Sequence, residues 1–263
     1  MLCGRLKISS TKKWIFNHGT RRKHDGFCTW LRPRCDKAWN DVLKAMSGAF
    51  TLRVPSLTKP TGAQRQLTYQ ALYKNFETMC LEYKAPIQLC GLSLGAILSL
   101  NYAIDHPDHI KSLVLIAPQY RIPKFLFTIQ HGVFRILPQK FFKGMGFSKK
   151  DTLSLMKSMT HLDFTSRLDA VHVNTLVLCG AKDRANRKAA ESLTALLSNA
   201  TFKEVSDAGH EVNIDNSLEL LSRFSTVLYV VNNQSKFHIK IHGIFKSATR
   251  ITMINPSKSV KII

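Results

Sequence analysis

Residues 91–95, Gly-Leu-Ser-Leu-Gly, place the hydroxyl of Ser93 between two glycines. A buried strand predicted over residues 86–90 runs into this segment, and an apolar helix predicted over residues 94–103 leaves it. Such a tight strand-to-helix turn is typical of a nucleophile elbow, which holds a serine hydroxyl above the edge of a sheet. The turn strains the backbone of Ser93 and requires small neighbours, a demand that Gly91, Gly95 and Ala96 meet. The alternative is a glycine-rich helix start in which the serine acts only as an N-cap.

A serine hydroxyl is a poor nucleophile until an imidazole removes its proton, and a carboxylate must hold that imidazole in one tautomer and stabilise its cation. Around the elbow the chain resembles the α/β-hydrolase family, over roughly residues 13–230. The resemblance implies the order nucleophile, acid and histidine along the chain, with each residue in a loop after a strand.

The resemblance assigns the acid to Asp183, because Leu176-Val177-Leu178-Cys179-Gly180-Ala181-Lys182-Asp183 is similar to the family's strand followed by G-x-x-D. It assigns the general base to His210, because Asp207-Ala208-Gly209-His210 is similar to the family's small-Gly-His loop. Asp183 lies 90 residues after Ser93, and His210 follows 27 residues later, separations that suit this fold.

Other ionisable residues fit these roles less well. Some relatives carry the acid after the preceding strand, but that position reads Ala117-Pro118-Gln119 here and has no carboxylate. The remaining candidates lie before a strand (Asp169), very close in sequence to the histidine (Asp207 and Asp215), or after the elbow helix, where we expect surface positions (His106 and His109).

Two backbone N–H groups should form an oxyanion hole. One belongs to Leu94, directly after the nucleophile. The resemblance assigns the other to Thr20, because Asn17-His18-Gly19-Thr20 is similar to the family's His-Gly turn after the first strand. His18 itself is interpreted as structural. His-Gly pairs also occur at 131–132 and 242–243, but neither follows a strand ahead of the nucleophile.

Short apolar runs alternate with longer amphipathic runs, a pattern typical of βαβ units. Strands are predicted at residues 14–16, 50–54, 86–90, 112–116, 175–179 and 202–205, and helices at about 36–48, 66–83, 94–103, 187–198 and 216–230. The strands are continuously apolar, which indicates a sheet covered on both faces. We therefore predict an α/β fold with a doubly wound, mostly parallel sheet of the α/β-hydrolase type and a small helical lid, in one domain over residues 1–230.

Two segments interrupt this pattern. Residues 119–164 hold seven of the fifteen phenylalanines, and we interpret them as a lid whose aromatic side chains line an acyl pocket or pack the lid onto the body. Residues 231–263 form a basic C-terminal extension with strand-like alternation at 237–241. Family members usually have two antiparallel strands ahead of the first loop, where this chain has about a dozen residues. Either the start is truncated relative to the family, or the extension supplies an edge strand in their place.

The net charge of +21 is concentrated at the ends: residues 1–35 carry nine Lys and Arg against one acid, and residues 231–263 carry six and no acid. A basic field attracts anions in general, and no nucleic-acid-binding motif accompanies it, so we expect a solvated surface without a specific nucleic-acid partner. We expect neither a transmembrane segment nor a secretory signal peptide. Cys90 and Cys179 lie in apolar runs, which favours buried thiols in a reducing cytoplasm over disulfides or a metal site.

The expected function is a cytoplasmic, esterase-like serine hydrolase that acts on a small acyl substrate through an acyl-enzyme, without a metal or other cofactor. The sequence leaves the oligomeric state and the choice among ester, thioester, lactone and amide open. Acyl transfer, C–C bond hydrolysis or perhydrolysis by the same triad is one alternative. A non-catalytic binding protein whose basic termini hold an anionic partner is another. A serine rather than an aspartate at the elbow disfavours haloalkane dehalogenase and epoxide hydrolase chemistry.

Overall fold

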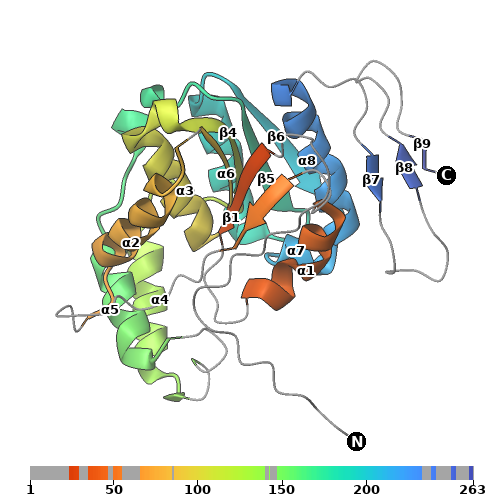
Figure 1. Ribbon diagram of the computed structural model, residues 1–263. Coiled ribbons are helices and arrows are strands. Elements are labelled where there is room, and N and C mark those ends of the chain that lie inside the picture. The colour runs from red at the N-terminus through yellow and green to blue at the C-terminus, as the bar shows by residue number, and fades with distance from the viewer. Residues whose placement is uncertain are drawn as a thin grey trace, which may run out of the picture.

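A six-stranded sheet with the order β2-β1-β3-β4-β5-β6 forms the centre of the molecule (Figure 1). The computed structural model describes residues 24–29, 35–46, 50–54, 66–84, 86–139, 142, 147–232, 238–240, 250–252 and 261–262. The six strands are β1 (His24–Thr29), β2 (Phe50–Arg53), β3 (Ile87–Leu92), β4 (Ile110–Ile116), β5 (Thr175–Gly180) and β6 (Ala200–Val205).

Helices connect these strands. They are α1 (Cys35–Met46), α2 (Tyr69–Leu81), α3 (Leu94–Asp105), α4 (Lys124–Ile136), α5 (Lys149–Met159), α6 (Arg184–Leu196), α7 (Val212–Asp215) and α8 (Ser217–Asn232), with the short 3₁₀ helices η1 (Pro107–His109) and η3 (Thr165–Ala170). The predicted α/β class is therefore confirmed, and the predicted elements from residue 36 to residue 230 are present within a few residues of their expected bounds.

All neighbouring strands of this sheet run parallel, so their carboxyl ends share one edge. The strand order reverses between β1 and β3: the chain steps from β1 outward to β2, returns through α2 to β3, and then proceeds outward to β6. In open α/β sheets, ligands bind outside the carboxyl ends of the strands at such a reversal. The segment that follows β3 begins with Ser93, so the fold places the predicted nucleophile at this point.

Both faces of the sheet are covered, as the continuous apolar strands predicted. In β4, Leu113 and Leu115 belong to the core under α2 and α3, whereas Val114 and Ile116 belong to the core under α1 and α8. The two helix layers lie on opposite sides of the sheet in Figure 1. The sheet is therefore doubly wound. The edge formed by the carboxyl ends of its strands lies between the two helix layers.

The strand predicted at residues 14–16 lies outside the described residues. The first described strand is β1, at His24–Thr29, which the sequence pattern did not predict. It pairs in parallel with β2 on one side and β3 on the other. Both partners supply backbone hydrogen bonds, so a segment of modest β-propensity can be a strand here.

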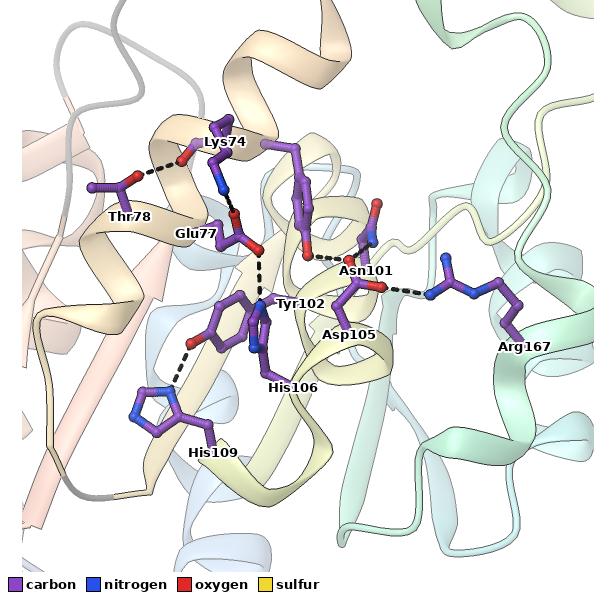
Figure 2. Close-up of polar contacts among 10 residues, drawn as sticks. Lys74, Glu77, Thr78, Asn101, Tyr102, Asp105, His106, His109 and Arg167 are labelled. Atoms are coloured by element: carbon purple, nitrogen blue, oxygen red, sulfur yellow. Dashed lines mark hydrogen bonds and ion pairs between the residues drawn. The ribbon is translucent and has the colours of Figure 1, made fainter.

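A polar cluster joins α2 to α3 and η3 at the end of α3 remote from Ser93 (Figure 2). The imidazole of His106 contacts Glu77 over 2.9 Å, and that of His109 contacts the hydroxyl of Tyr102 over 2.6 Å. Arg167 donates a 2.5 Å hydrogen bond to Asp105. His106 and His109 are half-buried here rather than exposed as expected, and they serve helix packing.

The C-terminal extension has its own small sheet. Strands β7 (His238–Lys240), β8 (Arg250–Thr252) and β9 (Lys261–Ile262) pair antiparallel in the order β7-β8-β9. The described edges of the main sheet are β2 and β6, and neither pairs with these strands. The prediction that the extension could supply an edge strand to the main sheet is therefore wrong for the described residues.

Candidate active site

Ser93 occupies the turn between β3 and α3 with φ 57° and ψ −116°. A positive φ is rare for a residue other than glycine and marks local strain. The N–H of Ser93 donates a 2.9 Å hydrogen bond to the carbonyl of Ile116 at the end of β4, which holds the turn against the sheet. The Ser93 side chain does not cap α3, so the N-cap interpretation is wrong. This is the strained strand-to-helix turn that the sequence predicted.

The tightness of this turn explains its glycine. A Cβ atom on Gly91 would lie 2.3 Å from the carbonyl oxygen of Gly95 and 2.6 Å from the amide nitrogen of Ala96. Both contacts are with backbone atoms, which cannot move aside as a flexible side chain could. Gly91 is therefore required for α3 to leave the sheet directly after Ser93.

Asp183 follows β5 and begins α6. Its side chain accepts a hydrogen bond from the N–H of Asn186 over 3.3 Å, which makes it the N-cap of the helix. Aspartate is among the best N-cap residues because its oxygen satisfies an otherwise unpaired N–H of the first turn. Asp183 as a whole residue is 7 % exposed. The helix start therefore fixes a buried carboxylate at the carboxyl edge of the sheet.

The loop that carries His210 packs directly on the loop that carries Asp183. The N–H of Lys182 donates to the carbonyl of Ala208 over 2.9 Å. A Cβ atom on Gly180 would lie 2.0 Å from the carbonyl oxygen of Gly209, so only glycine allows this approach. The N–H of Gly209 also donates to Asp215 over 2.8 Å. These contacts set the separation of the two side chains.

Nδ1 of His210 lies 2.8 Å from Oδ2 of Asp183. The imidazole is 43 % exposed and the carboxylate side chain is 5 % exposed, so the pair has one buried end and one end open to solvent. Burial by itself would raise the pKa of Asp183, but hydrogen bonds from His210 and Asn186 outweigh it and hold that pKa below its usual value. The carboxylate therefore stays ionised beside the imidazole.

The competing carboxylates have other partners. The side chain of Asp207 is 88 % exposed and pairs with Lys182 over 3.3 Å. Asp215 holds the N–H of Gly209, as described above. Of the carboxylates that the sequence offered near His210, Asp183 is the one whose side chain contacts the imidazole.

Two residues linked to Asp183, one directly and one through the other, were not predicted. Nδ2 of Asn186 lies 3.0 Å and 2.9 Å from the two carboxylate oxygens, and Nε2 of Gln119 donates to Oδ1 of Asn186 over 2.9 Å. The signal for Asn186 was its spacing: three residues after an N-cap is the position whose side chain reaches back in capping boxes. Nothing in the sequence paired Gln119 with it, because that contact joins segments 67 residues apart.

Of the two predicted oxyanion donors, Leu94 is among the described residues and Thr20 is not. Leu94 is the first residue of α3, and the first N–H groups of a helix have no acceptor within it. Its N–H therefore has no acceptor within α3 and lies directly after the serine, and its role as a donor stays a prediction. Thr20 lies outside the described residues, and β1 begins only at His24. The donor assigned to Thr20 stays a prediction.

Helices α4 and α5 lie within the 119–164 insertion. Its described phenylalanine side chains are in packing contacts: Phe142 and Phe164 are buried, Phe147 is partly buried against the core, and Phe134 meets Phe142 edge to face at 5.7 Å between ring centroids. The side chains of Phe125, Phe127 and Phe141 lie outside those described. These contacts favour the interpretation in which the aromatic residues pack the insertion onto the body.

Within the described part of the chain, no group of three or more His, Cys, Asp or Glu side chains is placed to hold a metal ion. Cys90 and Cys179 lie in β3 and β5 and are buried, as predicted. Burial raises the pKa of the Cys179 thiol to about 12. Among the described helices, none is long and apolar enough to cross a membrane.

The fold agrees with comparisons to solved structures. MenH from S. aureus matches with a TM-score of 0.66 and 17% identity, over 80% of this chain and 95% of that one. A thermophilic esterase from Thermogutta terrifontis matches with a TM-score of 0.67 and 18% identity, over 80% and 90%. The enol-lactonase from Burkholderia xenovorans LB400 matches with a TM-score of 0.67 and 16% identity, over 79% and 92%. The chain is therefore an α/β-hydrolase-fold protein.

Sequence comparisons are more local. Residues 66–165 match the family described as serine aminopeptidase S33, a stretch that includes the elbow. The chain is 36% identical over 92 residues to the probable lysophospholipase BODYGUARD 1 of Arabidopsis thaliana, a match that covers 30% of this chain. The match spans 20% of the length of that relative.

Proposed function

We propose that this chain is a serine hydrolase that cleaves a carboxylic ester, or a related acyl bond, of a small apolar substrate through an acyl-enzyme at Ser93. The observation that carries the proposal is the 2.8 Å contact between His210 and the buried Asp183, on the sheet edge where Ser93 follows β3 in a strained turn. A serine, an imidazole and a carboxylate after β3, β6 and β5 supply the three kinds of group that acyl transfer uses, which supports the proposal.

In the proposed reaction, Nε2 of His210 takes the proton of the Ser93 hydroxyl as Oγ attacks the acyl carbon. The negative charge that develops on the carbonyl oxygen is stabilised by the N–H of Leu94 and by a second backbone donor. The protonated His210 then gives its proton to the leaving oxygen. Water, activated by the same imidazole, releases the acid product and regenerates Ser93. Asp183 stays ionised throughout and stabilises the imidazolium.

The choice of an ester is supported by relatives named as an esterase and a probable lysophospholipase. A protein of the same fold is named as an enol-lactonase. The fold alone does not select the reaction, because one fold hosts many activities. We propose that α4 and α5 form a lid over the acyl side of the site.

The proposal is tested with a fluorophosphonate probe and a series of p-nitrophenyl esters of increasing acyl length. We expect the probe to label Ser93 and short to medium esters to be hydrolysed. Ser93→Ala and His210→Ala should each lower kcat by roughly 10⁴-fold or more, and the double variant should lose little beyond either single variant, because triad residues act as a unit. A folded Ser93→Ala protein that hydrolyses the esters at wild-type rate would refute the assignment. A wild-type protein that the probe does not label would favour the binding-protein alternative.

A further inference from the structure

Two amide side chains outside the triad form a chain of hydrogen bonds that ends on its acid. Gln119 follows β4 and donates to Oδ1 of Asn186 over 2.9 Å. Asn186, in the first turn of α6, has Nδ2 within 3.0 Å of both oxygens of Asp183. Because β4 and β5 are adjacent parallel strands, the loops after them meet at the sheet edge, and this chain bridges them.

The direction of each hydrogen bond follows from the chemistry of the groups. An ionised carboxylate only accepts, so Asn186 must turn its NH₂ group toward Asp183 and its carbonyl oxygen away. That oxygen can be satisfied only by a donor, and Nε2 of Gln119 is in place. The carboxylate thus fixes the amide of Asn186, and Asn186 fixes the amide of Gln119.

The same reasoning sets the tautomer of His210. Nδ2 of Asn186 also lies 3.2 Å from Nδ1 of His210, but an amide nitrogen cannot accept a proton. Oδ2 of the ionised Asp183 only accepts as well, so it cannot supply the hydrogen for its contact with Nδ1. Nδ1 of His210 must therefore carry its own hydrogen and donate it to Oδ2 of Asp183 at 2.8 Å. Nε2 is then left with a free lone pair, the form that a general base needs.

We propose that Asn186 and Gln119 are positioning residues that hold the acid ionised and aligned, and that through it they fix the reactive tautomer of His210. The proposal rests on the proposed function, since it assigns the pair a role in the same triad. Gln119 occupies the place after β4 where some relatives carry the acid itself. Here an amide at that place supports the acid after β5.

The test replaces each amide with an apolar side chain of similar size. Asn186→Leu removes two hydrogen bonds to a charged group, so we expect kcat to fall about 10- to 100-fold with little change in KM. Gln119→Met should have a smaller effect in the same direction. Without the donors of Asn186 the carboxylate becomes more basic, so the acid limb of the kcat/KM profile should move to higher pH in Asn186→Leu. The limb should move less in Gln119→Met, where Asn186 keeps its NH₂ group but loses the partner that orients it. Asn186→Ser, which restores one donor, should recover part of the loss.

A second measurement is independent of catalysis. The carboxyl ¹³C signal of Asp183 should titrate at higher pH in Asn186→Leu than in the wild-type chain. The matched control is Lys188→Ala, which alters an exposed residue two positions further along α6 and should change neither profile. If Asn186→Leu does not fold, both the pH profile and the ¹³C titration are measured on Gln119→Met.

An unchanged titration of Asp183 in both variants would overturn the proposal, as would a loss of kcat without any shift of the acid limb. The proposed function fails in a different way, because a wild-type protein that does not react with the probe has no activity to lose. The ¹³C titration still decides the role of the amide pair in that case.

Discussion

At the scale of single residues, Asp183 uses its two carboxylate oxygens for different tasks. Oδ1 accepts the backbone N–H of Asn186 and caps α6, while Oδ2 accepts from Nδ1 of His210. A substitution can therefore separate helix capping from charge, which makes this residue informative in experiments on the triad.

We expect Asp183→Asn and Asp183→Ala to differ in stability more than in activity. Asparagine keeps a capping oxygen, whereas alanine removes it at a cost of about 1 kcal/mol. Both remove the charge that stabilises the imidazolium, and Asp183→Asn should lower kcat by roughly 10²- to 10⁴-fold. Thermal unfolding and steady-state kinetics of the two variants test this. Equal melting temperatures would contradict the capping role, and wild-type activity in Asp183→Asn would refute its assignment as the acid.

The lowered pKa of Asp183 gives stability a definite pH dependence. The folded state favours the ionised form, so its contribution is complete above the ordinary carboxyl pKa of about 3.9 and is lost as the pH falls through the lower folded value. The unfolding free energy of the wild type, less that of Asp183→Asn, should therefore shrink below about pH 4. Denaturant titrations at a series of pH values measure this difference. A difference that grows as the pH falls through that range would be inconsistent with a lowered pKa.

At the scale of elements, the contact between the ends of β5 and β6 depends on Gly180. An added Cβ atom would meet the carbonyl oxygen of Gly209 at 2.0 Å, so Gly180→Ala must displace the loop that carries His210. We expect a lower melting temperature and a fall in kcat of at least tenfold, about 1.4 kcal/mol in the barrier.

Gly132→Ala is the matched control for this prediction. Gly132 lies within α4, and a Cβ atom there would meet no other atom within 4 Å. Alanine favours a helix over glycine by up to about 1 kcal/mol, so this variant should be as stable as the wild type or more so. If Gly180→Ala behaves like Gly132→Ala in melting and kinetics, the close approach of the two loops does not constrain the site.

Elements whose pattern is local were predictable from the sequence. The turn at Ser93, β5 ahead of Asp183 and β6 ahead of His210 each combine an apolar run with a characteristic turn, and each of these elements is present where expected. Strand β1 was not predicted, because His24–Thr29 owes its conformation to pairing on both sides. The hydrogen bond between Gln119 and Asn186 could not be predicted for a similar reason, because only the folded sheet brings their two loops together.

At the scale of the whole molecule, the C-terminal extension is separate from the sheet that carries the site. Its three strands pair with one another, whereas β2 and β6 form the described edges of the main sheet. Deleting residues 234–263 should therefore leave the melting temperature and ester hydrolysis close to those of the full chain.

A longer deletion provides the control. Removing residues 221–263 would take away Leu221 and Phe224, which are buried under the sheet, and should unfold the domain. Thermal unfolding of the two truncated chains and the full chain gives the melting temperatures to compare. A large drop in melting temperature for the shorter deletion would show that the extension contributes to the stability of the main domain.

The loops that carry Asp183 and His210 are joined by the backbone hydrogen bond from Lys182 to Ala208 and by the packing of Gly180 on Gly209. The proposed acid and base are therefore preorganised relative to each other before any substrate arrives. In the proposed reaction, little reorganisation energy then falls on this pair when charge develops in the transition state. A conformational change that controls turnover would then have to arise in another part of the molecule. Helices α4 and α5 are the elements to examine for it, because they form an insertion between strands.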